Sequence, residues 1–185
     1  MDLKGCLKKG DREMKLKNMV MVGVMAAIIF VATWIHIPIQ IGYASMIHLG
    51  TAALLIVAVV LEPKEAFLAA AIGMGLFDVM DPAFVVWAPF TFVIKGLMAF
   101  VVSYYIHKKP ETALHKLIAF ALGSVISIGG YYLAGCIIIG DMITPISHIP
   151  SAVTTSIIGI ILAMPLSAGV KASLKSMDKS KKHAA

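Results

Sequence analysis

One lysine interrupts an otherwise apolar stretch of the sequence. Residues 87–100 read WAPFTFVIKGLMAF, and Lys95 is the charged residue in their middle. An ammonium group in the apolar helix of a membrane protein costs at least about 2.5 kcal/mol unless it reaches water or finds a partner. The nearest acid in a comparable setting is Asp78, near the end of the preceding apolar run. We therefore expect either an ion pair between Asp78 and Lys95 that only holds two helices together, or a polar pocket that one or both of them line.

Other polar and aromatic side chains gather toward the same ends of the apolar runs as these two charges. Flat aromatic faces with a few hydrogen-bonding groups suit a small planar heterocycle. An aromatic belt at the membrane surface explains Trp87 and Tyr43 equally well, but it explains tyrosines deep inside a run less well. The candidate binding residues are Gln40, Tyr43, His48, Asp78, Trp87, Thr91, Lys95, Tyr131, Tyr132, His148 and Thr155.

The elements that must position these residues are membrane helices. The chain has 185 residues, of which 59% are hydrophobic and 14% charged, with a mean hydropathy of +0.91, which is too apolar for a soluble domain. A helix needs about 17 to 25 apolar residues to cross the hydrocarbon core. The sequence therefore predicts an all-α membrane protein with six transmembrane helices, at residues 18–35, 44–62, 64–80, 88–107, 113–139 and 148–170. Glu62, Pro63 and Lys64 separate the second run from the third and predict a helix stop there.

The basic residues predict the orientation. Of the sixteen Lys and Arg residues, all except Lys95 precede the first run, follow the sixth, or lie in the second and fourth connections. The other three connections contain none, so the positive-inside rule places both termini in the cytoplasm. We accordingly expect a basic cytoplasmic segment at 1–17, a membrane domain at 18–170 and a basic cytoplasmic tail at 171–185. The net charge of +6 then reflects topology rather than nucleic-acid binding.

Sequence signatures of enzymes and metal sites are missing. The chain has no phosphate-binding loop, no H-E-x-x-H zinc pair and no G-x-S-x-G nucleophile elbow. Its two cysteines, Cys6 and Cys136, are far apart and indicate neither a disulfide framework nor a metal site. We therefore expect no catalytic residue, no metal, no cofactor and no hydrolysis of ATP by this chain.

Small residues four positions apart mark faces where helices can approach closely. For the third run, internal packing is the favoured interpretation. For the first run, an interface with another membrane protein is about as well supported as internal packing. The pairs are Gly23 with Ala27, Ala69 with Gly73, Ala71 with Gly75, and Gly159 with Ala163.

Taken together, three segments resemble a known family. YASMIHLGTAALLIVAVVLEPKEAFLAAAIGMGLFDVM, WAPFTFVIKGLMAF and IPSAVTTSIIGIILAMPL are similar to the substrate-binding S components of energy-coupling factor (ECF) vitamin transporters, in the riboflavin, hydroxymethylpyrimidine or pyridoxine branch. Lys95 matches the lysine of the family's I-K-G stretch, and Asp78 matches the aspartate that closes its third helix. Gly23 and Ala27 match the family's docking motif.

The resemblance implies a subunit in a prokaryotic plasma membrane that captures a vitamin from outside. It implies docking onto a transmembrane coupling protein that carries two ATPases. At the positions where an Asn and a Gln are expected in the last helix, this chain has Ala152 and Thr155. We favour pyridoxine or hydroxymethylpyrimidine as the ligand, with riboflavin as the alternative. A different class of function also remains open, in which Asp78 and Lys95 couple ion movement to transport in a self-sufficient carrier or channel.

Overall fold

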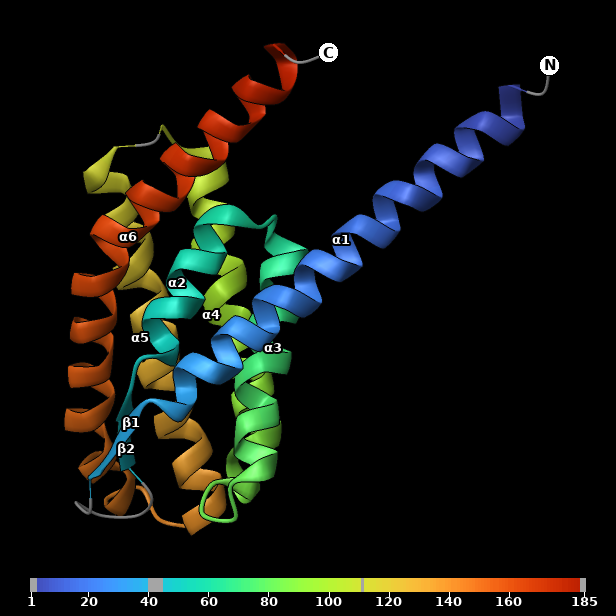
Figure 1. The fold of residues 1–185 in the computed structure, drawn as a ribbon. Coiled ribbons are helices and arrows are strands. Elements are labelled where there is room, and N and C mark those ends of the chain that lie inside the picture. Colours follow the sequence, from blue (N-terminus) through green and yellow to red (C-terminus); the bar gives the residue numbers. More distant parts are fainter. Residues whose placement is uncertain (1–2, 40–44, 111, 184–185) are drawn as a thin grey trace.

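The computed structural model describes residues 3–39, 45–110 and 112–183, and most of them are helical (Figure 1). The helices are α1 (Leu3–Trp34), α2 (Gly50–Val60), α3 (Pro63–Met80), α4 (Ala88–Lys108), α5 (Ala113–Ile139) and α6 (Ile149–His183). Two short 3-10 helices, η1 (Val85–Trp87) and η2 (Thr144–His148), lead directly into α4 and α6. Strands β1 (His36–Ile39) and β2 (Ser45–His48) form an antiparallel hairpin in which His36 lies opposite His48.

Helix ends occur where local chemistry requires them. Leu61 and Glu62 are extended, and Pro63 begins α3 at a position where its missing N–H is not needed. Thr112 caps α5 by accepting a hydrogen bond from the amide of His115 at 3.3 Å. Gly140 ends the same helix in the left-handed conformation, with φ of 77°, which a glycine adopts without strain. The predicted stop between the second and third runs is thus confirmed.

The second run differs from its predicted form. Residues 44–62 were expected to be one membrane helix, but residues 45–48 form β2 and α2 has only 11 residues. Such a helix is about 16 Å long, roughly half of the hydrocarbon thickness. Four strand residues add about 13 Å, so strand and helix together have about the reach of one span.

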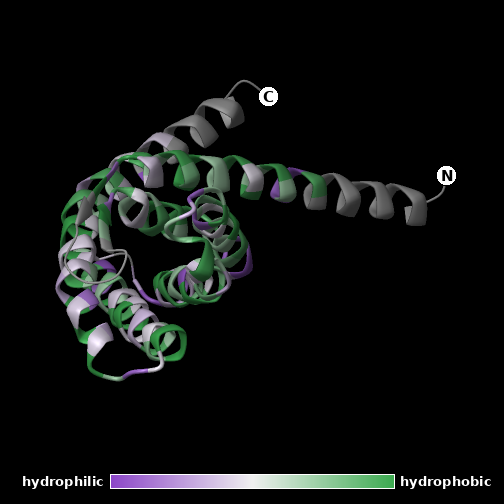
Figure 2. Cartoon of the chain, turned by 90° about the horizontal axis from the view of Figure 1, so that it is seen from below, coloured by the Kyte–Doolittle hydropathy of each residue, from purple (hydrophilic) through white to green (hydrophobic). Residues whose placement is uncertain are grey.

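Within the described part of the chain, four helical segments have the length and apolarity to span a membrane: 16–34, 85–108, 113–139 and 144–171. Large apolar side chains on them face outward, such as Leu133 and Ile161, which are 62% and 64% exposed. Figure 2 shows hydrophobic residues predominating along the helices. This surface suits lipid rather than water. The six-span count and the cytoplasmic position of both termini stay predictions.

The larger apolar core draws on all six α-helices and includes Leu54, Val59, Met98 and Phe120. Small residues let α3 pack closely against α1, and α6 against α2. A Cβ atom added to Gly73 would lie 2.6 Å from the backbone oxygen of Ala26 in α1. The small-residue face of α3 is therefore internal, as predicted.

Three of the connections lie together at one end of the bundle. Both described ends of the chain, on α1 and α6, lie at the opposite end (Figure 1). The β-hairpin, the turn between α3 and α4, and η2 lie together at the other end, next to a smaller apolar cluster of Trp87, Ile94 and Ala134. The fold thus places the connections that lack lysine and arginine on one side.

Candidate functional site

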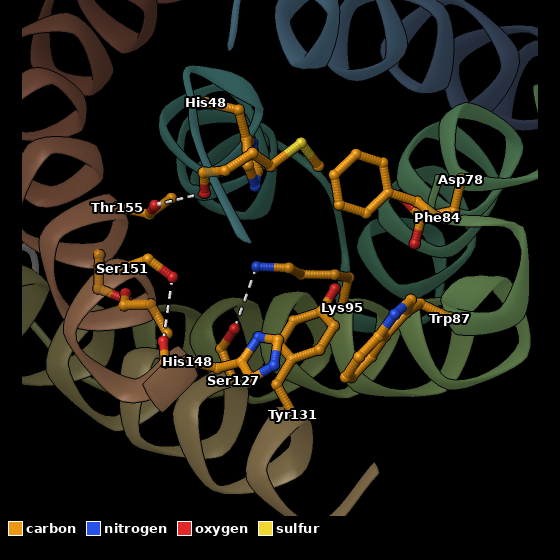
Figure 3. Close-up of a pocket in the computed structure, with 13 residues that line it drawn as sticks. His48, Asp78, Phe84, Trp87, Lys95, Ser127, Tyr131, His148, Ser151 and Thr155 are labelled. Atoms are coloured by element: carbon orange, nitrogen blue, oxygen red, sulfur yellow. Dashed lines mark hydrogen bonds between the residues drawn. The ribbon is translucent and has the colours of Figure 1, made fainter. Parts of the chain in front are cut away.

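A cavity of about 90 Å³ opens at the end of the bundle that holds the β-hairpin. Its walls come from β2, α3, the turn before α4, α4, α5, η2 and α6, so seven parts of the chain meet there (Figure 3). The lining residues are Met46, His48, Asp78, Phe84, Trp87, Lys95, Ser127, Tyr131, His148, Ser151, Ala152, Thr155 and Ser156.

Helical spacing explains how α4 and α5 each direct several side chains toward the cavity. Trp87, Thr91 and Lys95 are four residues apart and therefore lie on one face of the helix. Ser127 and Tyr131 have the same spacing on α5. The two faces meet where the Thr91 hydroxyl lies 2.9 Å from the Tyr131 hydroxyl.

Lys95 is buried but is held by hydroxyl groups. It is 4% exposed, and its Nζ donates to Ser127 Oγ at 3.0 Å and to Thr51 Oγ1 at 3.5 Å. The same Nζ lies 5.2 Å from the centre of the Tyr131 ring, within the range of a cation–π interaction. Three helices, α2, α4 and α5, therefore hold this ammonium group.

Of the two alternatives, the ion pair is not present, because no contact within 4.0 Å joins Asp78 to Lys95. Among the residues that the structure describes, the one contact within 4.0 Å between a basic and an acidic side chain joins His107 Nε2 to Glu62 Oε1 at 3.9 Å, near the end of the bundle that carries the chain ends. Asp78 instead interacts with the side chain of Thr91 and feels the charge of Lys95 from a greater distance. The two groups do not meet because Lys95 extends toward α5 and α6 and away from the end of α3 (Figure 3).

Aromatic rings form one side of the cavity. The ring centre of Trp87 lies 5.4 Å from that of His148 and 6.3 Å from that of Tyr131, with tilted planes in both cases. Phe84 adds a further ring near Asp78 (Figure 3). These faces are suited to cover the faces of a flat ligand.

Hydroxyl groups from the start of α6 form the opposite side. Ser151 and Thr155 are four residues apart and face the cavity together. Ser151 donates to the backbone oxygen of His148 at 3.0 Å, and Thr155 donates to that of Met46 at 3.3 Å. Each hydroxyl oxygen keeps lone pairs that can accept a further hydrogen bond.

His48 contributes a buried imidazole from β2. It is 8% exposed, and its Nδ1 has no hydrogen-bond partner among the described residues. An unsatisfied buried polar atom is uncommon and needs an explanation. In a cavity wall, a histidine is suited to act as donor or acceptor toward a bound molecule, according to its tautomer.

The loop that carries His148 is shaped by Asp141. The hydroxyl of Thr144 donates to this carboxylate at 2.5 Å, and the amides of Thr144 and Ile143 donate at 2.9 and 3.1 Å. These hydrogen bonds, the Thr144 hydroxyl first, lower the pKa of Asp141 to about 2. The carboxylate therefore stays ionised across the physiological pH range and keeps η2 in place.

Most of the predicted site residues come together. His48, Asp78, Trp87, Lys95, Tyr131, His148 and Thr155 all line the cavity. Thr91 lies behind it and connects Asp78 to Tyr131. Tyr132 is not among the lining residues, and its hydroxyl donates to the backbone oxygen of Met142 at 3.1 Å. Gln40 and Tyr43 lie outside the described residues.

Sequence reasoning missed the lining residues Met46, Phe84, Ser127, Ser151 and Ser156. Two of the serines could have been found, since Ser127 precedes Tyr131 by four residues and Ser151 precedes Thr155 by four. The position of Met46 in the cavity wall depends on the hairpin, which the alternating pattern IHIPIQI indicates. No group of three potential metal ligands occurs in the described ranges 3–39, 45–110 and 112–183.

The fold and the cavity define a class: a membrane-embedded helical protein with a small cavity of aromatic and polar side chains near one end. A sequence model of the family described as "ECF-type riboflavin transporter, S component" matches residues 13–172. The match covers most of the chain, and the protein belongs to this family of transporter subunits. Its members are substrate-binding subunits of transporters and not enzymes.

A solved structure supports the same fold. The protein described in "Structure and mechanism of the S component of a bacterial ECF transporter" superimposes with a TM-score of 0.70. The alignment covers 87% of this chain and 99% of that one, at 16% sequence identity. No curated protein matches the sequence.

Proposed function

We propose that this protein captures a small water-soluble vitamin or vitamin precursor outside a prokaryotic cell and delivers it to an ATP-driven ECF module. The observation that carries the proposal is the cavity around Lys95, built by seven parts of the chain at the end away from the chain ends. Six membrane crossings with both termini in the cytoplasm would place this cavity on the outer side. Capture would then need no chemistry by this chain.

A ligand with one heteroaromatic ring suits the cavity best, so we favour pyridoxine or hydroxymethylpyrimidine. The volume of about 90 Å³ is smaller than the roughly 150 Å³ that accommodates one benzene ring in another protein. A single ring therefore needs less rearrangement of the walls than a three-ring system. Trp87 and His148 would cover the ring, and Ser151 and Thr155 would bind its substituents.

Riboflavin is the second candidate, because the matching family is described by that vitamin. Two residues at the start of α6 make riboflavin the less favoured ligand. Ala152 and Thr155 stand where the amide side chains of relatives are expected, and both line the cavity. An amide both donates and accepts hydrogen bonds, whereas the alanine side chain does neither. We therefore expect this cavity to bind a ring whose edge carries a different pattern of hydrogen-bond donors and acceptors from the one that amide side chains would bind.

Calorimetry on the detergent-solubilised protein tests the proposal. Pyridoxine, hydroxymethylpyrimidine and riboflavin are titrated separately, and mass spectrometry identifies any small molecule that copurifies. We expect saturable binding of pyridoxine or hydroxymethylpyrimidine. Binding of riboflavin alone would move the assignment to the second candidate, and absence of binding by all three would overturn the proposal.

Vesicles that contain this protein alone distinguish capture from autonomous transport. A substrate-binding subunit should bind ligand without accumulating it against a gradient. Sustained accumulation driven by a proton or sodium gradient would contradict the proposal and support an ion-coupled carrier. The absence of direct contact between Asp78 and Lys95 gives that alternative no structural support.

A further inference from the structure

Two opposite charges share the cavity without meeting. Asp78 and Lys95 are each 4% exposed and both line it, yet no ion pair within 4.0 Å joins them. Opposite charges attract more strongly in a buried site than in water, because the surroundings screen them less. Holding them apart therefore requires other contacts that are specific to each group.

Those contacts form a continuous chain across the cavity wall. Ser127 and the Tyr131 ring hold the ammonium group of Lys95 on the side of α5. Thr91 holds the carboxylate of Asp78 on the side of α3 and also contacts the Tyr131 hydroxyl at 2.9 Å. Figure 3 shows the two charged groups on different sides of the cavity.

Both groups keep capacity for another partner. An ammonium group has three N–H donors, and the described residues supply two hydrogen-bond acceptors to Lys95, at 3.0 and 3.5 Å. A carboxylate accepts about four hydrogen bonds, and the one side chain that favours the charged form of Asp78 by hydrogen bonding is that of Thr91, among the described residues. The cavity therefore presents a donor on one side and an acceptor on the other, while its two charges cancel.

We propose that the ligand is a net-neutral, dipolar ring that lies between Asp78 and Lys95 and forms a hydrogen bond with each of them. A ring acceptor, such as a phenolic oxygen or a carbonyl, receives the third N–H of Lys95. A ring N–H, an amino group or a hydroxyl donates to Asp78. This inference rests on the proposed function and adds a charge rule to it: a ligand with a net charge leaves one of the two groups repelled or unpaired.

Three compounds with the same ring test the rule. Pyridoxine is neutral overall, 4-pyridoxic acid adds a carboxylate and pyridoxamine adds an ammonium group. The wild type should bind pyridoxine about 10- to 100-fold more tightly than either charged analogue, the range expected for a mispaired charged hydrogen bond. Equal or tighter binding of a charged analogue would overturn the inference.

Single substitutions should reverse this order in opposite directions. Asp78→Asn leaves Lys95 as the uncompensated charge, so 4-pyridoxic acid should become the preferred compound. Lys95→Met leaves Asp78 uncompensated, so pyridoxamine should become preferred. Each variant should also bind pyridoxine about tenfold or more weakly. Glu62→Gln and Lys108→Met each remove a single charge, one acidic and one basic, that does not line the cavity, and they should change neither affinity nor order.

The design separates the failure of the inference from the failure of the proposed function. If the wild type binds hydroxymethylpyrimidine or riboflavin instead of pyridoxine, the two single variants are measured with that compound. Should wild type bind none of the three vitamins, the proposed function fails. Should it bind one while both variants keep wild-type affinity, only the dipolar-ligand inference fails.

A double variant covers the case in which an unpaired charge prevents folding. Asp78→Asn with Lys95→Met leaves neither charge in the cavity and nearly preserves side-chain volume, so we expect a folded protein by thermal unfolding. Its affinity for the bound vitamin should fall about tenfold or more. Wild-type affinity in the double variant would overturn the inference.

Discussion

Two helices carry the same spacing of small residues but use it differently. On α3, Gly73 is buried against α1, and a Cβ atom at this position would lie 2.6 Å from the backbone oxygen of Ala26. On α1, Gly23 and Ala27 are exposed, and a Cβ atom on Gly23 would meet no atom within 4 Å. Close approach of helices in membranes depends on such small faces. Helix α3 thus uses its small-residue face inside the protein, whereas α1 leaves its own exposed.

Gly73→Val should have the largest effect. Its Cβ would lie 2.6 Å from a backbone oxygen, which moves only if α1 moves, so folding should lose about 3 kcal/mol or more. Thermal unfolding in detergent measures the loss. A variant with wild-type stability would show that α1 and α3 do not pack as closely as the structure has them.

Leucine at Gly23 and Ala27 should leave the isolated protein folded and remove its association with the coupling protein. Stability should stay within about 0.5 kcal/mol of wild type, as for other exposed positions. Copurification with the coupling protein and its ATPases should fall at least about tenfold. Gly129→Leu on α5, another exposed glycine without neighbours within 4 Å, is the matched control. Unchanged copurification would place the docking surface elsewhere.

Gly75→Ala sharpens the comparison within α3 itself. The added Cβ would lie 3.4 Å from the side chain of Phe92, which can adjust, so the cost should be at most about 1 kcal/mol. The measurement is again the unfolding temperature, read beside that of Gly73→Val. A cost as large as that of the valine variant would mean that the whole face, and not one close contact, governs packing.

Gly129→Ala should have the smallest effect and the opposite sign. The site is exposed and helical, so alanine should stabilise the protein by about 0.5 to 1 kcal/mol. Ligand binding should stay unchanged, because Gly129 does not line the cavity. Destabilisation would indicate that α5 needs flexibility at this point.

Much of the fold could be predicted because helix length and helix stops are local properties. The ends predicted for α3, α4 and α5 from the apolar runs agree with the observed ends to within a few residues. Pro63 marks the start of α3, as expected. Strand β2 at 45–48 was missed because it adjoins the apolar residues of α2, and a short apolar segment reads equally well as strand or helix. A short helix preceded by a strand has the same overall hydropathy as a single span.

The candidate site was predicted in part, and adjacent tyrosines show why. Tyr131 lines the cavity and Tyr132 does not, although both are equally deep in the same run. Neighbouring residues of a helix point about 100° apart, so the rotation of α5 decides between them. Periodicity gives little guidance here, since lipid-facing and core-facing positions are both apolar.

The sequence by itself determined that the protein is an apolar helical bundle with a charge in the middle of α4, because composition and run length act without tertiary contacts. Only the tertiary structure decided what that charge does. Lys95 meets Ser127 and Thr51 rather than Asp78, because the packing of α2, α4 and α5 sets the direction in which its side chain can extend. Such directions depend on contacts between distant segments, which no local pattern contains.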